Sequence, residues 1–191
     1  NIPAPMLALS RTIAAAIEVT ESALPFVDEL IEVRPDESQW RGAIERVLHG
    51  FAVSMLVDEN HYVALSGHIN DTNLGAKLIY FRTGRNAEPG HARALRPNSL
   101  VSKLTVKQCA FASWLDGDLR QRFDYECVES LKSFRAASDR AITREGQVKH
   151  SRSRHEKDDR SSIDARNHWV LGFDNRDKLA LFERDELELR Q

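Results

Sequence analysis

Residues 40–58 read Trp-Arg-Gly-Ala-Ile-Glu-Arg-Val-Leu-His-Gly-Phe-Ala-Val-Ser-Met-Leu-Val-Asp, and this stretch decides the fold class. Its large apolar residues recur at helical spacing and so share one face of a helix: Trp40, Ile44, Val47 and Leu48. Asp36, with Gln39 three residues later, predicts the capped start of this helix. Gly50 predicts its end, because glycine accepts the left-handed backbone of a helix terminus. The apolar run 51–57 then predicts a buried strand.

Similar elements lie on both sides of this stretch. Asp58 predicts the cap of a second helix, and residues 77–82 (Lys-Leu-Ile-Tyr-Phe-Arg) predict a second strand. Towards the N-terminus, residues 3–17 predict a helix and residues 27–33 a short strand. The first half of the chain therefore places a helix before each of two strands.

The same order recurs in the second half. Apolar spacing predicts helices at residues 111–119 and around residues 131–134, and strands at residues 99–107, 123–128, 140–143 and 169–173. Glu145-Gly146 predicts a hairpin turn into residues 147–150. The polar residues 151–166 predict an exposed loop, and the charged residues from Asp174 onwards predict a helix. Two halves that both read helix–strand–helix–strand predict an α/β fold of two lobes.

The expected organisation has five parts. Residues 20–82 form the first lobe and residues 100–177 the second. Residues 83–99, rich in Gly, Pro and Arg, form a basic linker between them. Residues 1–19 and 178–191 form helical stubs that would continue into a coiled coil.

Composition narrows the class of protein. Of 191 residues, 41% are hydrophobic and 29% are charged, as in a water-soluble globular domain, and no apolar run approaches the length of a membrane span. The chain carries only two cysteines and no secretory signal, so we expect a cytosolic fragment of a longer protein. Phosphate-binding, dinucleotide-binding and serine-hydrolase motifs are all missing from the sequence. We therefore expect no catalytic residues, cofactor or metal in this chain.

Positive charge is concentrated in the middle of the chain. Residues 82–107 hold six Lys and Arg against one acid, whereas residues 1–81 hold five against eleven. Two interpretations remain open: these cations bind DNA phosphates weakly and without sequence preference, or they neutralise the acidic first third. The candidate DNA-binding residues are Arg82, Arg85, Arg93, Arg96, Lys103 and Lys107, with a second group of Lys149, Arg152 and Arg154.

One segment carries an alternative function. Two imidazoles and three carboxylates lie within ten positions, and such a set can hold a divalent ion that activates water on a phosphodiester: His150, His155, Glu156, Asp158 and Asp159. Four interleaved Lys and Arg side chains lower the affinity for a cation, so a solvated loop is the favoured interpretation. A metal-dependent nuclease or DNA-processing domain is the alternative. A plain nucleic-acid-binding module built on residues 82–107 is a third hypothesis.

The order of these segments resembles the hinge, or dimerisation, domain of SMC proteins. In the first half, residues 28–33, 43–50, 51–57 and 77–81 are similar to that family's first strand, its helix with a Leu-Gly-Gly-type turn, its apolar strand and the strand that closes the first lobe. In the second half, residues 123–131 are similar to the strand and helix of the second lobe. Residues 141–148 are similar to the Val-Thr-Leu-Asp-Gly-Glu-Leu hairpin of that lobe.

Three shorter segments narrow the resemblance. Residues 24–26, 154–160 and 170–175 are similar to the SMC-like ATPase subunit (JetC type) of Wadjet, a plasmid-defence condensin related to MukB. The chain departs from the SMC pattern where His49 replaces the first glycine of a pair. It departs again where Ser151 and Ser153 stand in place of a second glycine pair.

The resemblance implies a mechanical function. Two copies would pair and join two long coiled coils, within a cytoplasmic, nucleoid-associated bacterial complex that organises or restricts DNA. The ATPase heads would lie outside this chain, and the other subunits would bind elsewhere on the full-length protein. We expect open strand edges at residues 77–82 and 147–150, and an unpaired strand edge tends to find a partner. The implied interface between the two copies consists of His49, Gly50, Lys77, Leu78, Ile79, Tyr80, Phe81, Gly146, Gln147, Val148 and Lys149.

Overall fold

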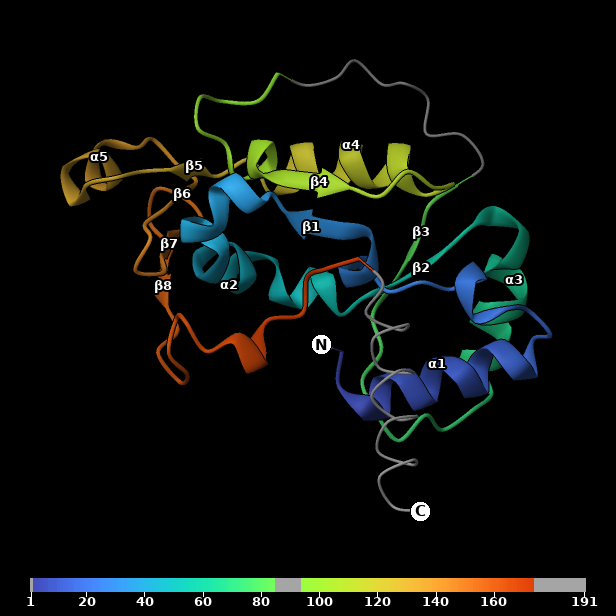
Figure 1. Ribbon diagram of the computed structural model, residues 1–191. Helices are drawn as coiled ribbons and strands as arrows, with labels where there is room; N and C mark the ends of the chain where they lie inside the picture. Colours follow the sequence, from blue (N-terminus) through green and yellow to red (C-terminus); the bar gives the residue numbers. More distant parts are fainter. Residues whose placement is uncertain (1, 85–93, 174–191) are drawn as a thin grey trace.

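A computed structural model describes residues 2–84 and 94–173 of the chain (Figure 1). The predicted helix from Asp174 onwards and the centre of the basic linker lie outside these ranges. Within them, no helix is long and apolar enough to cross a membrane.

The first half forms a small parallel unit. Strand β2 (Met55–Val57) pairs in parallel with β3 (Tyr80–Arg82), and helix α3 (Glu59–Asn70) connects them. Asp58 caps α3 as predicted, because its carboxylate accepts a hydrogen bond from the backbone N–H of His61. Helix α1 (Ala4–Ala16) packs against α3 (Figure 1).

The second half repeats this unit and extends it. Strand β5 (Glu126–Cys127) pairs in parallel with β6 (Ala141–Ile142), and α5 (Leu131–Ala136) connects them. Antiparallel strands β7 (Gln147–Lys149) and β8 (His155–Lys157) complete a sheet in the order β5-β6-β7-β8. The predicted turn at Gly146 is confirmed, since this residue adopts a left-handed backbone with φ of 92°.

The two halves share one core. Strand β1 (Ile31–Val33) of the first half pairs antiparallel with β4 (Leu104–Val106) of the second. Helix α2 (Arg41–Ala52) lies next to this pair, and α4 (Ala112–Arg122) lies on the side of β4 (Figure 1). Buried residues of both halves form a single cluster that includes Trp40, Ile44, Leu115 and Ile142. Because this cluster spans both halves, the relative placement of the two halves depends on a common apolar core.

The predicted boundaries of α2 were wrong at both ends. Asp36 lies in a 3-10 turn (Pro35–Trp40) and pairs with Arg34, so the α-helix begins only at Arg41. The helix also continues through Gly50 to Ala52, because Ser54 supplies the C-terminal contact by donating its hydroxyl to the Gly50 carbonyl. The predicted strand 51–57 is therefore reduced to Met55–Val57.

Other predicted strands are shorter than expected or absent. Residues 27–30 and 100–103 form 3-10 turns that lead into β1 and β4. The predicted strand 169–173 does not form, since this segment is held by α2 side chains and not by a neighbouring strand. Conversely, the predicted loop 151–166 contains β8, which pairs with β7 over its full length.

Candidate dimer and nucleic-acid interface

Strand β3 has one open edge among the described residues. Met55 N–H donates to the Ile79 carbonyl, and Thr83 N–H donates to the Val57 carbonyl, so these groups of the β3 segment face β2. Backbone groups alternate in direction along a strand, so the backbone N–H and C=O groups of Tyr80 and Arg82 face away from β2. The Ile79 side chain beside this edge is 45% exposed. An open edge with an exposed apolar residue is a site at which another strand can pair.

Strand β7 has no such edge. It pairs with β6 on one side and with β8 on the other, so the prediction of an open edge at residues 147–150 was wrong. Val148 and Lys149 are buried, and only Gln147 is partly exposed. The outer edge of this sheet is β8 instead, whose residues His155, Glu156 and Lys157 are all exposed.

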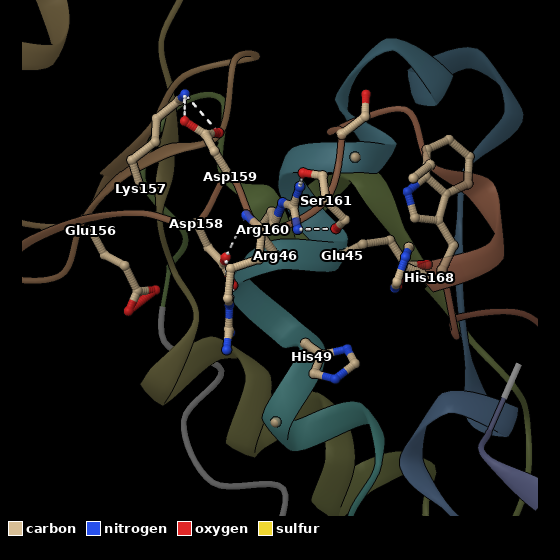
Figure 2. Close-up of a pocket in the computed structure, with 15 residues that line it drawn as sticks. Glu45, Arg46, His49, Glu156, Lys157, Asp158, Asp159, Arg160, Ser161 and His168 are labelled. Atoms are coloured by element: carbon tan, nitrogen blue, oxygen red, sulfur yellow. Dashed lines mark hydrogen bonds and ion pairs between the residues drawn. The ribbon is translucent and has the colours of Figure 1, made fainter.

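His49 and Gly50 lie on α2 at the rim of a cavity of about 820 Å³. The opposite wall is the segment from Glu156 to Trp169, which folds back over this helix (Figure 2). A Cβ atom on Gly50 would have open space around it, in contrast to a Cβ on Gly42, which would collide with the backbone of Ile163. The loop is therefore seated against Gly42, while Gly50 is left uncovered.

Most charged groups of this cavity pair with one another. Arg46 donates to the hydroxyl and the carbonyl of Ser161, and Arg160 forms an ion pair with Asp158 (Figure 2). Lys157 pairs with Asp159 at 2.7 Å. The contacts of Arg46 fasten the loop to α2, and the two ion pairs within the loop leave little unbalanced charge for a ligand.

Two imidazoles, those of His49 and His168, also line this cavity. The pKa of His49 is lowered, first because the ring is partly buried and then because His168 and Arg46 add positive charge nearby. A lowered pKa keeps this ring neutral near pH 7. His49 therefore adds no positive charge to the proposed interface at that pH.

Glu45 ties the end of the described chain to α2. Its buried carboxylate accepts hydrogen bonds from the backbone N–H groups of Val170 and Leu171, both at 3.0 Å. Arg41, one turn earlier, donates to the Leu171 carbonyl at 2.9 Å and covers the ring of Trp169. Burial raises the pKa of Glu45, and the two backbone hydrogen bonds oppose this shift. This contact was not predicted, because 125 positions separate the partners.

Three candidate DNA-binding residues of the basic segment are held in ion pairs with carboxylates. Arg82 pairs with Glu59, and Lys103 pairs with Glu37 at 3.0 Å and is nearly buried. Arg96 pairs with Asp139 and lies 3.5 Å from Asp124. The Arg82 and Lys103 pairs join basic residues to acids of the first third, an arrangement that agrees with the neutralising interpretation. Both interpretations remain predictions, because ion pairing on an exposed surface does not prevent contact with DNA.

The remaining candidates are divided between three settings. Arg85 and Arg93 lie outside the described residues, and Lys107 extends beyond β4, where its N–H donates to the Leu30 carbonyl. Lys149 is buried beneath α5. Arg152 and Arg154 are exposed on the β7–β8 turn, and Arg154 lies 3.6 Å from Glu156.

The proposed metal-binding segment does not converge on one point. Asp158 and Asp159 each face a cation, as described above. His155 instead directs its Nδ1 to the Ser153 carbonyl, and His150 pairs with the Tyr125 hydroxyl at 2.7 Å. Among residues 2–84 and 94–173, His, Cys, Asp and Glu form no group of three or more that could hold a metal ion. The described geometry therefore gives the nuclease hypothesis no support.

Comparisons with known proteins place the fold. No protein-family model and no curated protein matches the sequence. Among solved structures, the chain is similar to the Smc hinge domain of Pyrococcus furiosus with an extended coiled coil, with a TM-score of 0.56 at 16% identity. That match covers 97% of this chain and 72% of the other. A second structure of the Pyrococcus furiosus SMC hinge domain gives 0.55 at 19% identity, covering 90% and 93% of the two chains. An asymmetric dimer of the Geobacillus stearothermophilus SMC hinge domain gives 0.50 at 15% identity, covering 97% and 84%.

These similarities define the class of fold. The chain has the mixed α/β fold of SMC hinge domains across both of its halves. The sequence-based resemblance is thus confirmed at the level of the fold.

Proposed function

We propose that this chain is the homodimerisation hinge of an SMC-like protein. The observation that supports this most strongly is structural similarity to SMC hinge domains over 97% of the chain. Such similarity extends over both parallel units and the strand pair that joins them, so it does not depend on one short motif. In this role the chain is a non-catalytic connector that holds two long arms together.

The β3 edge is the proposed centre of the contact between two copies. Residues Lys77–Phe81 form or lead into this strand, and its outward backbone groups are available to a strand from the partner. His49 and Gly50 would add the uncovered surface of α2. Residues Gly146–Lys149 would take part only through β8, which covers their edge.

The full-length protein is proposed to be the SMC-like ATPase subunit of a Wadjet-type plasmid-defence condensin. Residues 24–26, 154–160 and 170–175 support this narrower assignment through their resemblance to that subunit. Coiled coils would extend from residues 1–19 and 178–191 towards ATPase heads encoded elsewhere in the protein. The complex would act on DNA in the bacterial cytoplasm, and loss of a test plasmid in cells carrying the complete system would be its readout.

Weak, nonspecific DNA binding is a second part of the proposal. The proposed contacts are Arg85, Arg93, Lys107, Arg152 and Arg154, of which Lys107, Arg152 and Arg154 are exposed in the described structure. Contacts to phosphates would release counterions, so binding would weaken steeply as salt rises.

Co-purification of two differently tagged copies of the chain tests the pairing proposal. We expect two copies of the parent chain to co-purify after co-expression, because each copy offers the same β3 edge. The same capture with Ile79→Lys in both copies should recover much less of the second tag. Failure of the parent chains to co-purify would argue against a hinge function.

A further inference from the structure

The strongest unassigned site is a cavity of about 510 Å³ at the far end of the second half, between α5 and the β7–β8 hairpin. This volume lies in the range of small-ligand sites. Its wall is formed by the last turn of α5 and the following residues, together with side chains of β7, β8 and the turn between them. The complete lining is Phe134, Arg135, Ala136, Ala137, Ser138, Lys149, Arg152 and His155.

The charge of this lining has one sign. It contains two arginines, a lysine and a histidine, and no carboxylate. The surrounding segment 127–157 has the same bias, with eight Lys and Arg against four Asp and Glu. The cavity beside α2 is different, because it is lined by both cationic and acidic side chains, and these form ion pairs with one another. A cavity lined by one sign of charge concentrates ligands of the opposite sign.

Lys149 forms the base of the cavity. Only 4% of this residue is exposed, and its Nζ donates to the carbonyls of Phe134, Arg135 and Ala137 at 2.7, 3.4 and 3.0 Å. These contacts satisfy its three donors and cap the C-terminal end of α5. They do not neutralise its charge: no carboxylate pairs with Lys149 within residues 2–84 and 94–173. A buried charge is normally balanced by an opposite one.

Arg135 and Arg152 supply the free donors at the rim. Both residues are exposed, and neither guanidinium has a hydrogen bond or ion pair within the described part of the chain. A guanidinium presents several N–H donors in a plane and matches two oxygens of a phosphate at once. The Ser138 hydroxyl lines the same space and adds a further donor. The His155 ring also lines it, with its Nδ1 directed to the Ser153 carbonyl.

We propose that this cavity binds a phosphate group, with Arg135 and Arg152 as direct contacts and the buried Lys149 charge as electrostatic support. The group is either that of a free phosphate or phosphate ester, or that of a nucleic-acid strand entering the cavity. The site lies apart from the β3 edge and does not depend on the pairing of two copies.

Amide chemical shifts of the isotope-labelled chain, titrated first with inorganic phosphate, provide the test. We expect saturable shifts confined to residues around Ser138, Lys149, Arg152 and His155, with a dissociation constant of about 1 mM for a few charge-assisted contacts. Arg135→Ala combined with Arg152→Ala should weaken binding at least about tenfold. Lys132→Ala is the matched control: it removes an exposed cation of α5 that does not line the cavity, and should leave the affinity unchanged.

Two further arms separate the sources of the phosphate group. A short DNA strand with a 5′-phosphate that binds more tightly than the same strand without it would identify a terminal phosphate. Equal binding of both strands, lost in the double variant, would identify backbone phosphates. Binding of inorganic phosphate with no response to either strand would identify a free ligand.

Two results of the phosphate titration would contradict the proposed site. Shifts spread over all basic residues, or equal phosphate affinity in the parent and the double variant, would overturn the proposal. Sedimentation of the same samples reports pairing separately, so a monomeric chain that binds phosphate would remove the hinge proposal and leave this one standing.

Discussion

Strands β3 and β7 are both three residues long, yet only one of them presents an open edge. Residues 77–82 and 147–150 both suggest a strand available to a partner. In the structure β3 pairs only with β2, whereas β7 lies between β6 and β8. The difference comes from β8, three exposed polar residues that lack the alternating pattern of a half-buried strand. Polar edge strands of this kind cover an apolar sheet and discourage further pairing.

The largest expected effect follows from the enclosed position of β7. Val148 is 2% exposed and belongs to the main core cluster, so Val148→Asp would place an unpaired charge in an apolar environment. We expect the free energy of unfolding to fall by about 3–5 kcal/mol, measured by urea denaturation. A nearly unchanged midpoint would mean that β7 is not an inner strand.

A smaller effect on stability, but a clear one on pairing, is expected at β3. Ile79→Lys places a charge beside the open edge, and since the side chain is already 45% exposed, the free energy of unfolding should change by only about 0.5 kcal/mol. The dissociation constant of the dimer should rise about tenfold or more, because like charges would meet across a two-fold contact. Val63→Lys, at a residue on α3 that is 77% exposed, is the control and should leave the dimer intact. Equal weakening by both substitutions would remove β3 from the interface.

The reactivity of the two cysteines tests whether the β5 edge of the four-stranded sheet stays folded. Cys127 on β5 is buried, which raises the pKa of its thiol to about 12, whereas Cys109 is exposed. Because the thiolate is the reactive form, we expect iodoacetamide near pH 8 to modify one thiol per native chain, at Cys109. Unfolding returns the Cys127 pKa to its ordinary value near 8.5, so denaturant should expose the second thiol. Mass spectrometry counts the adducts, and rapid modification of Cys127 without denaturant would show that this edge of the sheet opens.

The smallest expected effect concerns DNA. Arg85→Glu with Arg93→Glu should weaken nonspecific binding and lower the slope of log affinity against log salt by about 2. Lys103→Gln should not change that slope, since Lys103 is nearly buried beside Glu37. Fluorescence anisotropy at two salt concentrations measures both. Identical slopes for all three proteins would exclude the basic linker as a DNA contact.

The local signals in the sequence predicted the local structure well. Asp58 caps α3, Gly146 makes the β6–β7 turn, and the helix–strand–helix–strand order appears in both halves. Each of these features depends on contacts between residues a few positions apart, and residue type alone indicates such contacts.

Contacts between distant segments were not predictable in the same way. The β1–β4 pair joins strands about seventy positions apart, and the Glu45 carboxylate reaches the backbone of Val170 and Leu171. No periodicity marks such partners. The predicted helix end at Gly50 was wrong because glycine permits a helix end but does not require one. Helix α2 continues to Ala52, and the Ser54 hydroxyl donates to the Gly50 carbonyl.

The candidate site was predicted in part. Of the predicted strand 77–82, only Tyr80–Arg82 form a strand, and its edge is open, but the second proposed edge is closed by β8. The cation-lined cavity around Lys149 was not anticipated as a cavity, because its wall combines α5 with the β7–β8 hairpin. Only the fold shows that Lys149 points beneath a helix end while Arg152 remains outside.

The mass of the chain in solution tests the central claim most directly. Light scattering coupled to gel filtration, across a range of concentrations, should give twice the chain mass of 21.7 kDa, and Ile79→Lys should shift the profile towards the single chain. A mass of 21.7 kDa for the parent at the highest concentration that stays in solution would contradict the hinge account.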